Sequence, residues 1–121
     1  MVEWDSSDSE FRDGLSAIQE KVGDALKAQG KLDAAVEEYQ QSLDQRRTLA
    51  DQDKFNAGGQ HDLIVLLCKL ASARSATESS DNVLKAKTLL QEAINLAAEY
   101  NGADRQKLID SIKQSSQAFG Q

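Results

Sequence analysis

Apolar side chains recur along this chain at intervals of three and four residues, the spacing that places them on one side of an α-helix. The first series consists of Phe11, Leu15, Ile18, Val22 and Leu26. The second follows almost at once and consists of Leu32, Ala35, Val36, Tyr39, Leu43 and Ala50. The pattern predicts helices over residues 11–29 and 32–51, each burying its apolar stripe against the other.

Capping signals place the ends of these segments. The motif Ser7-Asp8-Ser9-Glu10 matches a capping box, in which a hydroxyl and a glutamate satisfy free amides at a helix start. Gly30 supplies a stop between the first two helices, since glycine adopts the left-handed conformation that ends many helices. Ser80 or Asp81 is expected to cap a later helix over residues 81–100.

The segment from Leu63 to Ala76 is apolar on nearly every side. A helix of that composition belongs in the centre of a fold rather than on its surface. We therefore predict a buried third helix over residues 57–76, although Gly58 and Gly59 weaken its first turn by roughly 1 kcal/mol each relative to alanine.

Two further helices complete the prediction. The fourth carries the stripe Val83, Ala86, Leu90, Ala93, Ile94 and Ala97 and ends at Asn101-Gly102. The fifth opens around Asp104 and turns Leu108, Ile112 and Phe119 inward. The expected fold class is all-α, with the first four helices forming two antiparallel hairpins and the fifth covering the end.

Composition supports this fold class and excludes some classes of binding partner. The chain has 121 residues, enough for one domain, with no proline and only 5% aromatic residues. Its net charge of -6 disfavours nucleic acid and anionic lipid surfaces. No stretch approaches the roughly 18 apolar residues of a membrane span, and the first residues lack the order of a signal peptide. We expect a cytoplasmic protein that binds neither nucleic acid nor membrane.

Few side chains are candidates for catalysis or for metal binding. Cys68 is the single cysteine, and its place in an apolar run predicts a small core residue. His61 has no second histidine or cysteine at metal spacing, and we expect it at the surface or at a helix start. We predict no metal, no cofactor and no catalytic residues, so the protein is not expected to be an enzyme.

The chain also repeats itself. Moving the sequence by about 48 places aligns Leu15 with Leu63 and Val22 with Leu70. Beyond the next loop the offset becomes about 51, and Ala35 then meets Ala86. An internal period of this size, built from paired helices, is typical of stacked helical repeats.

The segment from Val22 to Leu43, VGDALKAQGKLDAAVEEYQQSL, closely resembles a tetratricopeptide repeat. The resemblance gives Gly23 the role of allowing close helix approach, places Ala35 where the two helices touch, and directs Tyr39 and Ser42 toward the next repeat. The extension through Asp53 is similar to the long-helix variant found in arrays of large bacterial proteins. The second copy is degenerate, because Ala71 stands at the position that matches Gly23 and the turn glycine is missing.

This resemblance implies an organisation and a binding surface. It divides the chain into an acidic leader at 1–8, a first repeat at 9–53, a degenerate second repeat at 54–101 and a capping helix at 102–121. The first helix of each repeat lines a concave face in such proteins, which assigns partner contacts to Glu20, Asp24, Lys27, Ser72 and Ser75. Cys68 and Ser72 occupy matching positions, but the apolar run around them predicts that they face the core.

Several alternatives stay open at this point. Glu20, Asp24 and Lys27 also fit an ordinary hydrated helix face. Two repeats and a cap can form a minimal solenoid, a compact five-helix bundle or a dimer. The favoured function is a scaffold that binds a protein or peptide. A self-associating structural protein is the second hypothesis, and a helical-bundle enzyme or ligand carrier is the third.

Overall fold

A computed structural model describes residues 6–53, 56–77, 79–100 and 102–117. These residues form five helices: α1 (Ser6–Ala28), α2 (Leu32–Gln52), α3 (Ala57–Ala76), α4 (Ser80–Glu99) and α5 (Arg105–Gln117). None of the described residues forms a β-strand. The all-α prediction is therefore confirmed, and the predicted bounds of α2, α3 and α4 agree with the structure within one residue at each end.

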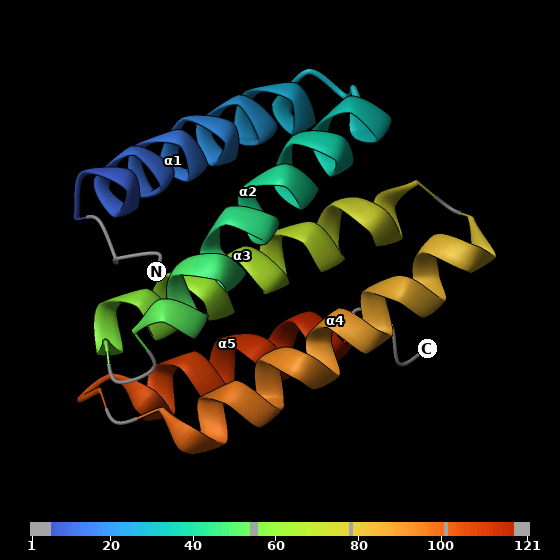
Figure 1. Cartoon of the computed structure of the whole chain (residues 1–121). Coiled ribbons are helices and arrows are strands. Elements are labelled where there is room, and N and C mark those ends of the chain that lie inside the picture. Colours follow the sequence, from blue (N-terminus) through green and yellow to red (C-terminus); the bar gives the residue numbers. More distant parts are fainter. Residues whose placement is uncertain (1–5, 54–55, 78, 101, 118–121) are drawn as a thin grey trace.

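The helices α1, α2 and α3 follow one another in the order of the chain, and α5 lies beside both α4 and α3 (Figure 1). Each packs against the helix that follows it, and α5 also reaches α3. The helix α3 therefore contacts α2, α4 and α5 and takes the central position that its composition predicted.

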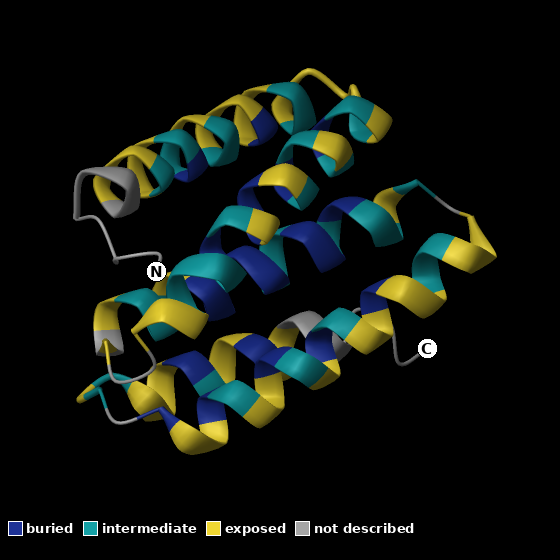
Figure 2. Cartoon of the chain, viewed as in Figure 1, coloured by how far each residue is buried: buried dark blue, intermediate teal, exposed yellow. Residues whose placement is uncertain are grey.

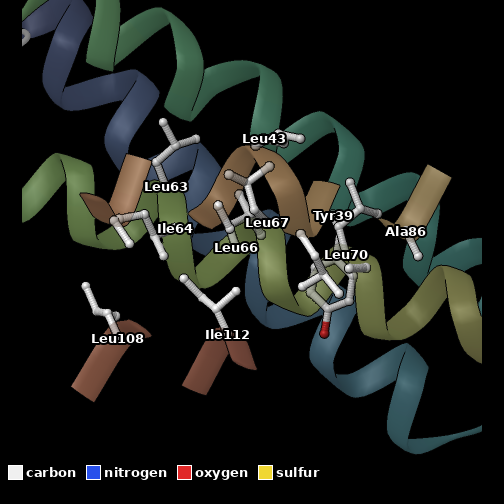
Figure 3. Packing of buried hydrophobic residues seen from close by; sticks show 14 of the residues in the cluster. Tyr39, Leu43, Leu63, Ile64, Leu66, Leu67, Leu70, Ala86, Leu108 and Ile112 are labelled. Atoms are coloured by element: carbon white, nitrogen blue, oxygen red, sulfur yellow. The ribbon is translucent and has the colours of Figure 1, made fainter. Parts of the chain in front are cut away.

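The core is built around α3. Leu63, Ile64, Leu66, Leu67, Leu70, Ala71 and Ala73 are all buried. Figure 2 shows the buried colour along most of α3, whereas the outward sides of α1 and α4 are largely exposed. In Figure 3 the α3 leucines meet Tyr39 and Leu43 from α2 and Ile112 from α5.

The turn between α1 and α2 depends on Gly30. This glycine has a φ of 79°, in the left-handed region that favours glycine. The amide of Lys31 donates to the Leu26 carbonyl at 2.9 Å, and the Gly30 amide donates to Lys27 at 3.0 Å. These two bonds form a Schellman motif, which satisfies the free carbonyls of the last turn of α1.

One predicted helix start and one predicted cap were wrong. The helix α1 already includes Ser6, so the Ser7–Glu10 motif lies inside its first turns instead of preceding them. At α4 the capping residue is Ser79, not Ser80 or Asp81, because the Ser79 side chain accepts a bond from the Asn82 amide at 3.4 Å. By contrast, α3 begins at Ala57 as predicted, with Asn56 accepting from the Gly59 amide at 3.0 Å.

Small residues let α1 and α2 approach closely. A Cβ atom added at Gly23 would lie 2.7 Å from the Tyr39 ring, which covers the glycine. The Ser42 hydroxyl donates to the Ser16 carbonyl at 2.7 Å. Ala35 is fully buried, as its predicted contact role requires. Ser42 thus faces α1 rather than the next repeat, and this part of the prediction was wrong.

The apolar stripe predicted to be inward on α1 is largely exposed. Phe11 is 69% exposed, Ile18 is 61% exposed and Val22 is also exposed. The buried side of α1 instead carries Ser16 and Gly23, because a close helix contact selects small residues. Since α1 is the first helix of the stack, α2 covers only one of its sides, and periodicity alone did not reveal which one.

The last helix covers the far end of the core. Leu108 and Ile112 of α5 are buried, as predicted, and they point toward α3 (Figure 3). Phe119, the third residue of the predicted stripe, lies outside the described residues. On α4, Ile94 was predicted to be inward but is 38% exposed, whereas Ala86, Leu90, Ala93 and Ala97 of the same stripe are buried.

Candidate partner-binding surface

The residues predicted to bind a partner come together on one surface formed by α1 and α3. We call this surface the α1–α3 face and define it by six residues: Glu20, Asp24, Lys27, Lys69, Ser72 and Ser75. The side chains at 20, 24 and 27 share one side of α1, because steps of four and three return to the same side of a helix. The steps of three along α3 do the same for the other half of the face.

Lys69 joins the two helices at the centre of this face. Its Nζ atom lies 2.6 Å from Glu20 Oε2 and 3.1 Å from Asp24 Oδ2. Burial alone would lower the pKa of Lys69, but the hydrogen bonds to both carboxylates outweigh burial and raise it. The lysine therefore remains protonated and neutralises part of the acidic charge of α1.

Asp24 is also tied to the core below it. The Tyr39 hydroxyl donates to Asp24 Oδ1 at 2.5 Å. Burial and this bond raise the pKa of Tyr39 well above its usual range, so the phenol stays protonated and acts as the donor. Asp24 thus has a structural role in addition to any contact with a partner.

The other end of the face is held by hydrogen bonds to serine. Lys27 Nζ donates to Ser72 Oγ at 2.8 Å, and the Ser75 hydroxyl donates to the Ser72 carbonyl at 2.8 Å. Cys68 and Ser72 were predicted to face the core. Cys68 is half-buried and packs against the hydrophobic core, as predicted, whereas half-buried Ser72 bonds to Lys27 of α1. Around Ser72 and Lys69, α1 meets α3 through polar side chains.

The thiol of Cys68 gives a direct test of its packing against the core. Burial raises its pKa to about 11. At pH 8 the fraction of Cys68 present as thiolate is therefore about 100-fold lower than for an ordinary thiol. A thiolate of higher pKa is more nucleophilic, which recovers about tenfold of the reaction rate. We expect thiol reagents to modify native Cys68 at least tenfold more slowly than the unfolded chain, with the rate rising steadily as the pH increases toward 11. Equal rates in buffer and in denaturant would contradict this environment for Cys68.

His61 belongs to a separate polar cluster. Its Nε2 atom lies 3.2 Å from Asp104 Oδ2, and the Tyr100 hydroxyl donates to Asp104 Oδ1 at 2.6 Å. The hydrogen bond from Tyr100 lowers the pKa of Asp104. His61 was predicted at the surface or at a helix start, and it lies in the second turn of α3 with a half-exposed side chain. The cluster links α3 to the segment between α4 and α5.

A cavity of about 450 Å³ opens where the ends of α1, α2 and α3 meet. Its lining includes Glu10, Asp13, Arg46, Asp53 and Asp62. The nearly buried guanidinium of Arg46 lies 2.5 Å from Asp13 and 3.6 Å from Asp62. These ion pairs join three helices.

Sequence reasoning found five of the six residues of the α1–α3 face and missed Lys69. The missing signal was available, because Lys69 precedes Ser72 by three residues and so shares its side of α3. What the sequence could not supply was the pairing of Lys69 with Glu20, since 49 positions separate them along the chain.

No protein-family model matches the chain, and comparisons with curated proteins and with solved structures also give no match. The similarity to tetratricopeptide repeats therefore stays a prediction from the residues that carry it.

None of the described helices is both long enough and apolar enough to cross a membrane. Within the same residues, no group of three or more histidine, cysteine or acidic side chains is arranged to hold a metal ion.

Proposed function

We propose that this protein is a tetratricopeptide-like interaction module that binds a protein or peptide segment on the α1–α3 face. One observation carries the proposal: residues about one repeat apart in sequence meet on this face. Lys27 contacts Ser72 at a separation of 45 positions, close to the internal offset of the sequence. Lateral stacking of equivalent helices is the arrangement that a helical repeat array would produce.

The charges of the face indicate the kind of ligand that it suits. Two carboxylates and two ammonium groups lie together with two serine hydroxyls. A mixed surface of this kind offers donors and acceptors to an extended polar segment and lacks the cationic clamp that a free carboxylate would need. The proposal includes no catalytic step and no cofactor.

The test requires a variant that changes the face without unfolding it. Reversing the charges of Glu20 and Asp24 is unsuitable, because both carboxylates form ion pairs with Lys69. Asp24 also accepts a hydrogen bond from the Tyr39 hydroxyl. Lys27→Glu is cleaner, since the hydrogen bond of Lys27 within the described residues goes to a half-buried serine. Lys21→Glu is the matched control, because it makes the same charge change at an exposed position of α1.

Partners captured by the full chain should be quantified by mass spectrometry for the parent and both variants. We expect at least one partner to be lost with Lys27→Glu and retained with Lys21→Glu, while circular dichroism shows the same helix content. Equal recovery of every partner by the two variants would contradict binding at this face.

A second candidate function is self-association through the exposed side of α1. Phe11, Ile18 and Val22 lie on that side and form an apolar stripe on an otherwise charged helix. Light scattering after size exclusion would detect a dimer, and Ile18→Ser would remove it. Because each copy carries a net charge of -6, added salt should strengthen such a dimer.

A further inference from the structure

A second surface feature lies on the side of the molecule where α2 and α4 flank α3 (Figure 1). There an open groove of about 310 Å³ is bounded by side chains from all three helices. We call it the α2–α4 groove and define it by Arg47, Arg74, Leu84, Lys85, Leu89 and Glu92. It shares no residue with the α1–α3 face.

The charge of this groove is opposite to that of the whole protein. Three of its six defining residues are cationic and one is anionic, whereas the chain has a net charge of -6. Arg47 Nη2 pairs with Glu92 Oε1 at 2.6 Å and so spans from α2 to α4. Two cationic groups, Arg74 and Lys85, then remain in excess over the carboxylates that line the groove.

Arg74 is held in place by neutral acceptors. Its Nη1 atom donates to Asn82 Oδ1 at 2.8 Å, and its Nη2 atom donates to Gln40 Oε1 at 3.3 Å. Amide oxygens orient a guanidinium but do not cancel its charge. Arg74 is therefore a preoriented cation at the groove, which lowers the entropic cost of binding a carboxylate there.

Lys85 can exchange its partner at little cost. It pairs with Asp81 at 3.1 Å, one helical turn away, and the two side chains are 55% and 74% exposed. Ion pairs between such exposed side chains contribute little to stability, so a carboxylate from another molecule can compete for the lysine.

Apolar side chains lie beside these cations. Leu84 is 64% exposed on α4, and Leu89 is half-buried against the core. A large exposed leucine next to fixed positive charge means that a matching ligand needs both an apolar group and an anionic group.

We infer that the α2–α4 groove binds an acidic peptide segment that carries a large apolar side chain. The apolar side chain would pack on Leu84 and Leu89, and neighbouring carboxylates would pair with Arg74 and Lys85. Charge complementarity favours this partner over nucleic acid or an anionic membrane. The net negative charge of the protein repels an extended polyanion, whereas a short segment meets the local excess of cations.

The binding test uses the full chain and a fluorescent synthetic peptide, followed by anisotropy. The peptide has about 12 residues, with two leucines at the centre and aspartate and glutamate around them. One analogue replaces the acids by asparagine and glutamine, and another replaces both leucines by serine. We expect saturable binding of the parent peptide that weakens as salt is added, and at least tenfold weaker binding of each analogue.

Variants of the protein locate the site. Leu84→Ser and Lys85→Gln change exposed side chains of α4, and each should weaken binding of the parent peptide by about five- to tenfold. Ile94→Ser and Lys87→Gln are comparable changes at exposed α4 positions outside the groove and should leave binding within about twofold. Arg74→Gln should have the largest effect, and its melting curve reports whether the fold is intact.

Three results with the peptide would overturn the inference. The first is an absence of saturable binding, and the second is equal binding of the amide analogue. The third is equal loss of binding in the groove variants and their α4 controls. Vesicles containing phosphatidylserine and a single-stranded oligonucleotide complete the comparison. If either competes for the groove more strongly than the peptide and loses binding in Lys85→Gln, the partner is a polyanion and not an acidic peptide.

Discussion

Replacing Gly23 by valine is expected to lower the free energy of unfolding by about 2–4 kcal/mol. Even a Cβ atom at this position would lie 2.7 Å from Tyr39 Cε1 and 2.8 Å from Tyr39 Cδ1. The ring cannot move freely, because it is 1% exposed and its hydroxyl is bonded to Asp24. A branched side chain would therefore separate α1 from α2 or break that bond. Urea unfolding followed by circular dichroism measures the loss.

Gly14→Val is the matched control for this prediction. Gly14 lies on the same helix, is exposed, and has no atom within 4 Å of an added Cβ. Valine has a slightly better helix propensity than glycine, so this variant should stay within about 0.5 kcal/mol of the parent or gain stability. If the two variants unfold at the same urea concentration, the close approach at Gly23 does not hold.

Replacing Ile112 by aspartate is expected to destabilise the protein by about 3–5 kcal/mol. Ile112 is 1% exposed and packs from α5 onto the α3 core (Figure 3). A carboxylate cannot be buried there without a partner, so α5 would detach and leave the apolar side of α3 and α4 uncovered. Thermal unfolding should shift to lower temperature, and size exclusion should show self-association of the variant.

Ser111→Asp provides the control, because it adds the same charge at the neighbouring exposed position of α5. We expect its melting temperature to match that of the parent. A destabilisation by Ser111→Asp as large as that of Ile112→Asp would show that added charge, and not the loss of packing, weakens α5.

The two ends of the stack show how far the sequence predicts this fold. The all-round apolarity of α3 predicted its central position, because only a helix covered on several sides can carry that composition. The terminal helix α1 was harder, since an apolar stripe and a covered side need not coincide when only one neighbour is present. Its buried side is marked by Ser16 and Gly23, which hydrophobic periodicity does not detect.

For the two candidate surfaces, too, spacing within one helix was informative and packing between helices was not predictable. Residues on one helix could be assigned to one side from their spacing, as with Glu20 and Lys27. Contacts between helices could not be assigned in this way. The pair formed by Arg47 and Glu92 spans 45 positions, and no local pattern in the sequence links them. The α2–α4 groove therefore became apparent only from the packed helices.

The order in which the helices pack also has a consequence for how the chain folds. Every strong helix contact joins neighbours in sequence, apart from the contact between α3 and α5. Few long loops must then close before favourable contacts form, and chains with such local topology fold in about microseconds to milliseconds. A nascent chain can begin to pack as soon as two adjacent helices have emerged, without waiting for its carboxyl end.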